Sequence, residues 1–159
     1  MTKPNFLLRP VMAADEDAIV ELWRRTWQTA YPGIDFAARL GWWRERWRSE
    51  LVPFCTILVA ETAGAAANQD RRSIIGFVTV DARTGYLDQF AVAPEAWGGG
   101  AAAALLDAAK RTAPSGLDLH VNEDNGRAIR FYEKNGFVFI AVETNARSGA
   151  PVHKMSWRP

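Results

Sequence analysis

The run of three glycines at residues 98–100 constrains the fold of this chain more than any other feature. It separates an apolar segment, residues 86–92, from residues 101–112, which are rich in alanine and strongly favour a helix. Glycine lets a bound group approach the backbone N–H groups closely, and the first N–H groups of a helix have no partner within it. A strand, a glycine turn and a helix N-terminus together favour a site for an anion such as a diphosphate.

The elements on either side of this turn alternate in type. Apolar periodicity predicts strands at 6–11, 56–60, 73–80, 86–92, 117–121, 137–142 and 152–157, and helices from Asp15 to the break at 31–33 and at 36–49, 101–112 and 127–135. Pro10 places the first strand near an edge, Pro53 is expected to end the second helical segment, and residues 62–72 favour a polar loop. This order predicts an α/β protein with a mixed sheet and helices on both faces, forming a single domain over residues 1–159.

Composition argues against several other classes of protein. The net charge of +1 gives no electrostatic case for a nucleic acid or an acidic membrane, and no segment approaches the roughly 18 apolar residues of a membrane span. Acidic residues come too early for a signal peptide. The single Cys55 excludes an internal disulfide framework, and the two histidines give no metal signal. We therefore expect a cytoplasmic protein with no metal, nucleic-acid or membrane partner.

Two kinds of nucleotide site compete for the glycine run. Residues 98–103 match G-x-G-x-x-A, the dinucleotide fingerprint, and Asp118 lies roughly the expected ~20 residues further on. However, the fingerprint should follow its strand directly, and residues 94–97 intervene. Asp118 also lies near the start of the next predicted strand, whereas the acid of the fingerprint should end it. A nicotinamide-dependent enzyme is the alternative that this pattern leaves open.

A second motif follows at residues 119–137. It consists of an apolar strand and then N-x-x-A-x-x-F-Y-E-K-x-G-F from Asn125 to Phe137. With the glycine run, where a Val-x-Pro-Glu segment precedes Gly100 and Ala102, it resembles the two coenzyme A segments of the GNAT (GCN5-related N-acetyltransferase) family. The resemblance covers residues 86–137, and the N-terminal third is similar only in the order of its elements.

The resemblance implies a GNAT fold, with a mixed, mostly antiparallel sheet of about seven strands, about four flanking helices and a splayed parallel strand pair. It also implies an N-acetyltransferase that uses acetyl-CoA and moves the acetyl group to a primary amine by direct attack in a ternary complex. The acceptor would be a small-molecule or peptide amine, and the protein a monomer or homodimer. A catalytically weak CoA-binding regulatory module is the alternative, because Trp97 stands where the family has Gln or Arg.

Site residues follow from the same resemblance. Strand amides would pair with the pantetheine arm, loop amides would hold the pyrophosphate, and the helix after Asn125 would cover the cofactor. The expected cofactor-binding residues are Phe90, Ala91, Val92, Trp97, Gly98, Gly99, Gly100, Ala101, Ala102, Asn125, Ala128, Tyr132 and Lys134. Trp97 leaves only its indole N–H as a side-chain donor in the loop. Tyr132 would also be the general acid for the leaving thiolate, and amides near Phe90 and Ala91 would stabilise the oxyanion.

The roles on the acceptor side are less constrained. Strand alternation would place residues 86, 88, 90 and 92 on one face, and Asp88 is the candidate base for the amine. An ion-paired or solvated carboxylate is the equal alternative for Asp88. Trp27, Tyr31 and Tyr86 are candidate acceptor contacts, which suit an apolar amine or an ammonium. His120 and His153 are expected to be structural.

Overall fold

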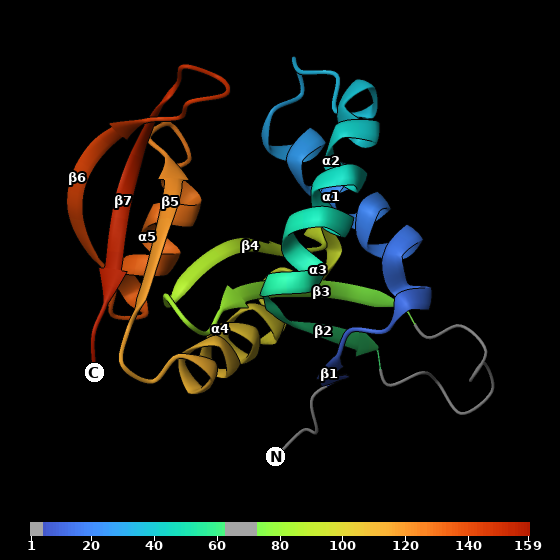
Figure 1. Ribbon diagram of the computed structural model, residues 1–159, viewed down its shortest axis with the longest axis horizontal. Coiled ribbons are helices and arrows are strands. Elements are labelled where there is room, and N and C mark those ends of the chain that lie inside the picture. The colour runs from blue at the N-terminus through green and yellow to red at the C-terminus, as the bar shows by residue number, and fades with distance from the viewer. Residues whose placement is uncertain (1–4, 63–72) are drawn as a thin grey trace.

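The computed structural model describes residues 5–62 and 73–159 (Figure 1). Seven strands in these residues form one mixed sheet in the order β1-β2-β3-β4-β5-β7-β6. Their bounds are β1 Phe6–Pro10, β2 Thr56–Thr62, β3 Ile74–Asp81, β4 Tyr86–Val92, β5 Leu117–Asn122, β6 Val138–Thr144 and β7 Pro151–Trp157. The loop predicted at 62–72 lies outside the described residues, apart from Thr62, which ends β2. The predicted mixed sheet and its edge strand at Pro10 are confirmed.

The β4–β5 pair divides the sheet into two halves. It is the parallel pair of the described sheet, and Tyr86 opposite Asp118 is its one register pair, whereas β3 and β4 pair along most of their length. Beyond that point β4 and β5 diverge, so that β1–β4 and β5–β7–β6 lie at a wide angle (Figure 1). The splayed parallel pair is therefore confirmed, and the edge of β4 beyond Tyr86 faces a gap.

Helices cover both faces of this sheet. Their bounds are α1 Glu16–Ala30, α2 Leu40–Arg46, α3 Val52–Phe54, α4 Ala101–Thr112 and α5 Gly126–Lys134, with a π-helical turn at Trp47–Leu51. The helix predicted at 36–49 is wrong in extent, because a 3₁₀ turn precedes α2 and the π turn continues it into α3. Pro53 does not end the segment. It lies within α3, and the helical run continues to Phe54.

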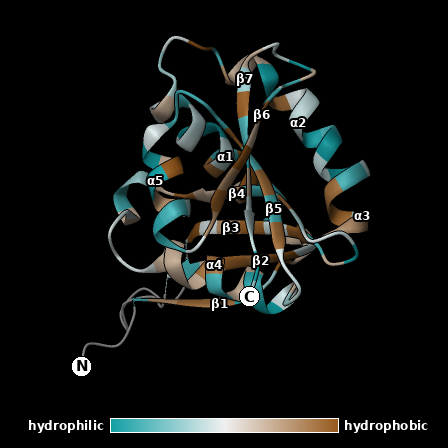
Figure 2. Ribbon diagram, turned by 90° about the vertical axis from the view of Figure 1, so that its left-hand side faces the viewer, coloured by the Kyte–Doolittle hydropathy of each residue, from teal (hydrophilic) through white to brown (hydrophobic). Residues whose placement is uncertain are grey.

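Each face of the sheet has its own hydrophobic core, and the central strands β2 and β3 carry mostly hydrophobic residues between the two (Figure 2). On one face α1, α2 and the π turn bury a stack of tryptophans. Trp43 lies 4.9 Å from Trp23 and 5.5 Å from Trp47, measured between ring centroids. On the other face α4 packs on the sheet through Leu105 and Leu106, and α5 packs through Tyr132. Trp23, Trp43 and Trp47 thus form part of the hydrophobic core on this face.

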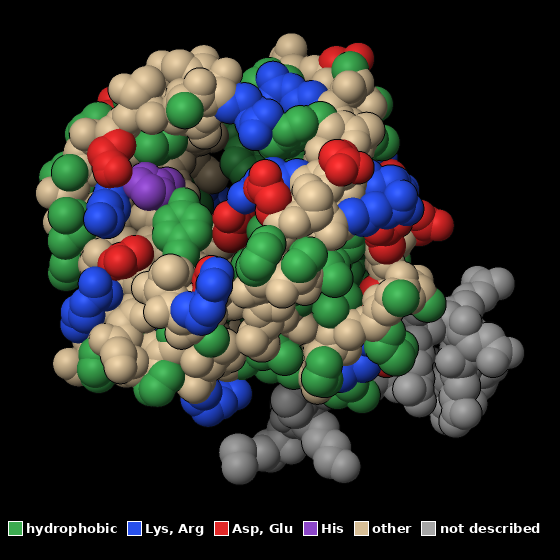
Figure 3. Space-filling view, viewed as in Figure 1, with side chains coloured by type: hydrophobic (Ala, Val, Ile, Leu, Met, Phe, Trp, Pro, Cys, Tyr) green, Lys and Arg blue, Asp and Glu red, His purple; other side chains and the backbone are tan. Residues whose placement is uncertain are grey.

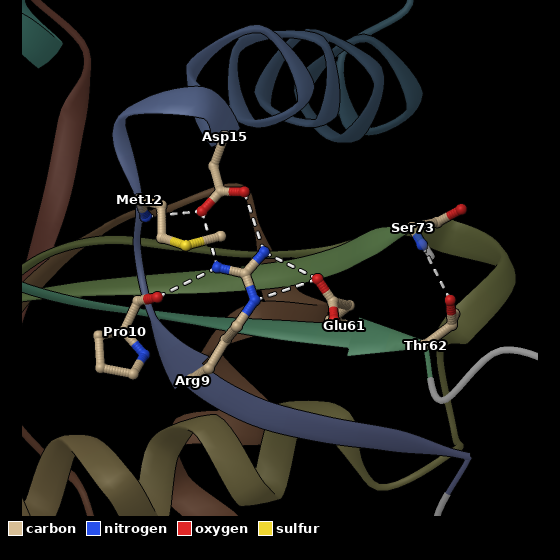
Figure 4. A network of polar contacts seen from close by, with 7 residues as sticks. All are labelled: Arg9, Pro10, Met12, Asp15, Glu61, Thr62 and Ser73. Carbon is tan, nitrogen blue, oxygen red and sulfur yellow. Dashed lines mark hydrogen bonds and ion pairs between the residues drawn. The ribbon is translucent and has the colours of Figure 1, made fainter. Parts of the chain in front are cut away.

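An ion-pair network holds β1 to β2 and to the start of α1 (Figure 4). Arg9 lies between two carboxylates, 2.8 Å from an oxygen of Asp15 and 2.8 Å from one of Glu61. Asp15 also accepts a hydrogen bond from the Met12 N–H. The hydrogen bonds from Arg9 keep the pKa of Asp15 below its usual value.

No helix in the described residues is long and apolar enough to cross a bilayer.

Candidate active site

The glycine turn presents unpaired backbone donors. Gly98 and Gly100 have φ angles of +83° and +91°, a region that residues with a Cβ rarely adopt. The N–H of Gly99 bonds to Ala96, and that of Ala104 is the first to bond back to Gly100. Within the described residues, the N–H groups of Gly98 and of residues 100–103 have no acceptor. Together they form a concave group of donors at the positive end of α4, which suits an anion.

Trp97 is fixed at the edge of this turn. Its indole N–H donates to the carbonyl of Val92 at 2.9 Å, so the donor that we expected to face a phosphate is used within the protein. The guanidinium carbon of Arg127, from α5, lies 3.4 Å from the centroid of the Trp97 ring. Burial lowers the pKa of Arg127, and no carboxylate in the described parts of the chain pairs with it. The loop therefore gains a cation from α5 that its own sequence lacks.

The ladder between β3 and β4 determines which amides of β4 face the gap. The N–H of Ala93 donates to the carbonyl of Ile75 in β3's ladder. In an antiparallel ladder the hydrogen-bonded positions recur at every second residue, so the N–H of Ala91, opposite Phe77, also faces β3. The amides of Phe90 and Val92 therefore point away from β3 and into the gap. Ala91 lies in the expected segment, but its N–H is turned toward β3. Phe90 and Val92 are thus the two amides of the predicted trio that a ligand in the gap can reach.

A β-bulge corrects the predicted face of β4. Thr79 pairs with Gln89 and Val80 with Leu87, so Asp88 is an extra residue without a partner in the ladder. The prediction that residues 86, 88, 90 and 92 share one face is therefore wrong. Phe90 packs with the α4–α5 cluster, whereas Asp88 bonds to α2 on the opposite face. Strict alternation in the sequence gives no sign of a bulge.

Arg46 of α2 engages both oxygens of Asp88, at 2.7 and 2.6 Å. This hydrogen-bonded pairing raises the pKa of Arg46. The pair lines a pocket of about 350 Å³ together with Tyr86 and Cys55. Burial raises the pKa of the Cys55 thiol to about 11, which disfavours the thiolate. Ion pairing is the alternative role that the sequence left open for Asp88, and Arg46 is a partner that the sequence did not reveal.

Helix α5 brings Tyr132 beside Phe90. The Asn125 side chain caps the helix by accepting a hydrogen bond from the Ala128 N–H at 3.3 Å. Tyr132 is 7% exposed, and its ring centroid lies 6.1 Å from that of Phe90. Burial raises the pKa of its hydroxyl, which makes no hydrogen bond within the described residues. Lys134 lies exposed in the last turn.

The candidate acceptor contacts lie on the α1–α2 side. Tyr31 donates to Asp124 at 2.6 Å and accepts from Asn122 at 3.1 Å, so it joins the end of α1 to the turn after β5. Burial, with the bond to Asp124, raises the pKa of Tyr31 to about 12. Trp27 stacks on Tyr31 with ring centroids 5.7 Å apart. Tyr31 therefore spans the opening between the two halves of the sheet.

Tyr86, the third candidate contact, bonds to a residue that we expected to be merely structural. Its hydroxyl is 2.7 Å from His120 Nδ1, and His120 Nε2 is 3.1 Å from a carboxylate oxygen of Glu143. Figure 3 shows a hollow between the β5–β7–β6 half and α1 and α2, with acidic, basic and histidine side chains around it. No pattern in the sequence indicates Glu143, which lies 23 residues from His120.

The sequence profile of the "Acetyltransferase (GNAT) family" matches residues 16–137. Because this is most of the chain, the protein belongs to the GNAT family of acetyltransferases. The match extends into the N-terminal third, where the motifs alone are weak.

Individual relatives agree with this assignment. The chain is 27% identical over 156 residues to the peptidyl-lysine N-acetyltransferase YiaC of Escherichia coli, covering 95% of this chain and 96% of that protein. It is 28% identical over 121 residues to the peptidyl-lysine N-acetyltransferase YjaB of Salmonella typhimurium, covering 76% and 75%. Its fold is similar to that of the PaiA N-acetyltransferase of Thermoplasma acidophilum, solved with coenzyme A, at a TM-score of 0.68 and 21% identity over 97% of this chain and 99% of that one.

Proposed function

We propose that this protein is an acetyl-CoA-dependent N-acetyltransferase that acts on a primary amine by direct attack in a ternary complex. One observation carries the proposal: the free amides of the glycine turn, the gap-facing amides of β4 and the Tyr132 side chain lie along one path. Gly98 and Gly100 begin this path after β4, and Tyr132 beside Phe90 ends it. A long ligand with a diphosphate at one end and a reactive group at the other fits such an arrangement.

The described residues offer hydrogen-bond donors for both the pyrophosphate and the pantetheine arm of coenzyme A. The free N–H groups of Gly98 and residues 100–102 would hold the pyrophosphate, with Gly99 shaping the turn. Arg127, stacked on Trp97, would supply the positive charge that the loop lacks. The gap-facing N–H of Val92 would pair with a pantetheine amide as a neighbouring strand does. Ala128 leaves room beside it, and the free amide nitrogen of Asn125 and the ammonium of Lys134 are further donors.

Acetyl-CoA supplies an activated thioester when it is bound, and the protein positions and protonates the reacting groups. The N–H of Phe90 would donate to the carbonyl oxygen as negative charge develops on it. Tyr132 would donate its proton to the departing sulfur. Its raised pKa keeps the hydroxyl protonated at neutral pH, as an acid must be before it acts.

The amine must lose a proton before it attacks, and Asp88 is one candidate base. Both of its oxygens are engaged by Arg46, so Asp88 serves this role only when that pair opens. The substitution Asp88→Asn tests it through the pH dependence of turnover. A shifted acidic limb supports Asp88, and an unshifted limb removes it from the mechanism.

We propose a lysine side chain of a peptide as the acceptor. Two relatives are named as peptidyl-lysine N-acetyltransferases. Asp124 bonds to Tyr31 and Glu143 to His120, and neither carboxylate pairs with Lys or Arg within the described residues. Carboxylates that no Lys or Arg neutralises attract a cationic acceptor, and Trp27, Tyr31 and Tyr86 offer aromatic surface for its alkyl chain and ammonium.

An acceptor panel tests this proposal. Calorimetry first measures the binding of acetyl-CoA, coenzyme A and NADH. Thiol release from acetyl-CoA is then followed with a blocked peptide that carries one lysine, with its Lys→Ala counterpart bearing a free N-terminus, and with spermidine. We expect acetyl-CoA binding and release with the lysine peptide. Binding without release from any acceptor would favour a regulatory CoA-binding module, and binding of NADH alone would overturn both.

A further inference from the structure

A hydrogen-bonded chain of three side chains crosses the base of the gap between the two halves of the sheet. Tyr86 begins β4, His120 lies on β5 and Glu143 lies near the end of β6. The hydroxyl of Tyr86 meets His120 Nδ1 at 2.7 Å, and His120 Nε2 meets Glu143 at 3.1 Å. Three strands from both halves thus contribute to one polar chain.

The two partners define the tautomer of neutral His120. An ionised carboxylate only accepts hydrogen bonds, so Nε2 carries the hydrogen and donates it to Glu143. Nδ1 is then an acceptor, and it takes the hydroxyl hydrogen of Tyr86. The chain has one direction, from hydroxyl to imidazole to carboxylate. This is the polarity in which an imidazole removes a proton through a hydroxyl and a carboxylate stabilises the resulting cation.

This chain faces the acceptor side of the sheet. Leu117, Leu119 and Val121 are buried with α4 and α5, so alternation along β5 turns His120 to the opposite face. Tyr86 is the residue at which β4 still pairs with β5, and the gap opens beyond it. The hollow between α1, α2 and the β5–β7–β6 half lies on this face (Figure 3).

We propose that Tyr86 and His120 form the proton relay that deprotonates the acceptor amine, with Tyr86 contacting the amine and His120, held by Glu143, receiving the proton. The inference rests on the proposed acetyl transfer, since it assigns the base which that reaction requires. Asp88 is then a structural partner of Arg46 on the wall of the site. Tyr86 is the catalytic residue of the pair because it touches the substrate, and Glu143 is a positioning residue.

Each proton in this step has a destination. An ammonium hydrogen moves to the Tyr86 oxygen while the Tyr86 hydrogen moves to His120 Nδ1, which leaves a neutral amine and an imidazolium. The amine nitrogen then bonds to the thioester carbon, the carbon–sulfur bond breaks, and a second N–H proton balances the proton that the thiol gains. The His120 side chain is 31% exposed, so it can return its proton to water. Amide, thiol and one proton are the net products.

The relay does not require a tyrosinate. Burial raises the pKa of Tyr86 to about 12, but the hydroxyl loses one proton as it gains another. The charged groups that act on Tyr86 are Arg46 on α2, Asp88 on β4, Asp118 on β5 and Glu143 on β6. His120 faces Glu143 through Nε2, and Lys154 on β7 is its partner in the strand ladder.

The test compares His120→Gln, Tyr86→Phe and Glu143→Gln with His153→Gln, which removes the other histidine of the chain. His153 lies 3.4 Å from Glu123 and contacts Phe139, outside the relay. Turnover of acetyl-CoA with the blocked lysine peptide is measured from about pH 6 to about pH 10. Calorimetry measures the affinity of each variant for acetyl-CoA, and NMR follows the His120 ring during a pH titration.

We expect His120→Gln and Tyr86→Phe to lower kcat at neutral pH by about 100-fold or more. Their rates should then rise with pH toward the pKa of the free lysine, about 10.4, because only the neutral amine reacts. Glu143→Gln should move the acidic limb and the His120 titration to lower pH, since the imidazolium loses its carboxylate. His153→Gln should match the wild type, and acetyl-CoA affinity should stay unchanged throughout.

A wild-type pH profile in His120→Gln or in Tyr86→Phe would overturn the relay. An unchanged titration of the His120 ring in Glu143→Gln would also overturn it. This NMR measurement remains informative even if one of the other variants misfolds. Failure of the wild type to bind acetyl-CoA or to release thiol would instead contradict the proposed function.

Discussion

At the scale of single residues, Tyr132 is unusual because its hydroxyl contributes no hydrogen bond to the described structure. We expect Tyr132→Phe to leave the melting temperature and the affinity for acetyl-CoA unchanged, since no contact is lost. Turnover should fall by about 100-fold because the leaving thiolate loses its acid. Stopped assays of thiol release and calorimetry check both parts. Unchanged turnover would exclude Tyr132 as the acid.

Arg127 gives the second prediction at this scale. Its guanidinium lies over Trp97 without a carboxylate partner in the described residues, beside the free amides of the glycine turn. Arg127→Met should weaken coenzyme A binding about tenfold, the effect of losing one charged hydrogen bond of about 1.5 kcal/mol. Arg130→Met removes another exposed arginine of α5 and is the matched control. Equal losses in the two variants would indicate a general charge effect.

At the scale of elements, the network around Arg9 ties β1 and β2 to the start of α1. Asp15→Asn should lower the free energy of unfolding by about 1–3 kcal/mol at neutral pH. Because the folded pKa of Asp15 lies below its unfolded value, its contribution is present above about pH 4 and is lost as the pH falls further.

Urea unfolding at several pH values measures this effect. The wild type should lose stability below about pH 4 more steeply than Asp15→Asn. The hydrogen bond from Arg48 lowers the pKa of Glu16 to about 2. Glu16 therefore adds the same pH dependence to the unfolding free energy of both proteins. Parallel curves for the two proteins would contradict the assignment.

The helices and strands also show which parts of this structure the sequence alone predicts. The glycine run and the segment from Asn125 to Phe137 predict the strand–turn–helix site, because local propensity and capping act within a few residues. The bulge at Asp88 and the π turn were not predicted, since both depend on packing against neighbouring elements. The pairs that shape the acceptor side join residues far apart in the chain, such as Arg46 with Asp88, and no local pattern encodes them.

At the scale of the whole molecule, the two halves of the sheet are joined beyond Tyr86 by side-chain contacts rather than by a strand ladder. Tyr31 provides one of them, because it reaches from α1 to Asp124 and Asn122 on the other half. This bridge lies at the opening of the gap that we propose as the acceptor site. Its strength should therefore affect both stability and access by the acceptor.

We expect Tyr31→Phe to lower the free energy of unfolding by about 1–2 kcal/mol, because Asp124 and Asn122 lose a half-buried hydrogen-bond partner. Amide hydrogen exchange should accelerate at the end of α1 and in the turn after β5, but not in α4, which packs away from this bridge. The KM for the lysine peptide should rise more than kcat falls. Asp124→Asn, which keeps an acceptor oxygen for the hydroxyl, is the milder control. Exchange that accelerates equally in α4 would mean that the substitution loosens the whole fold, and the bridge would then have no specific role at the gap.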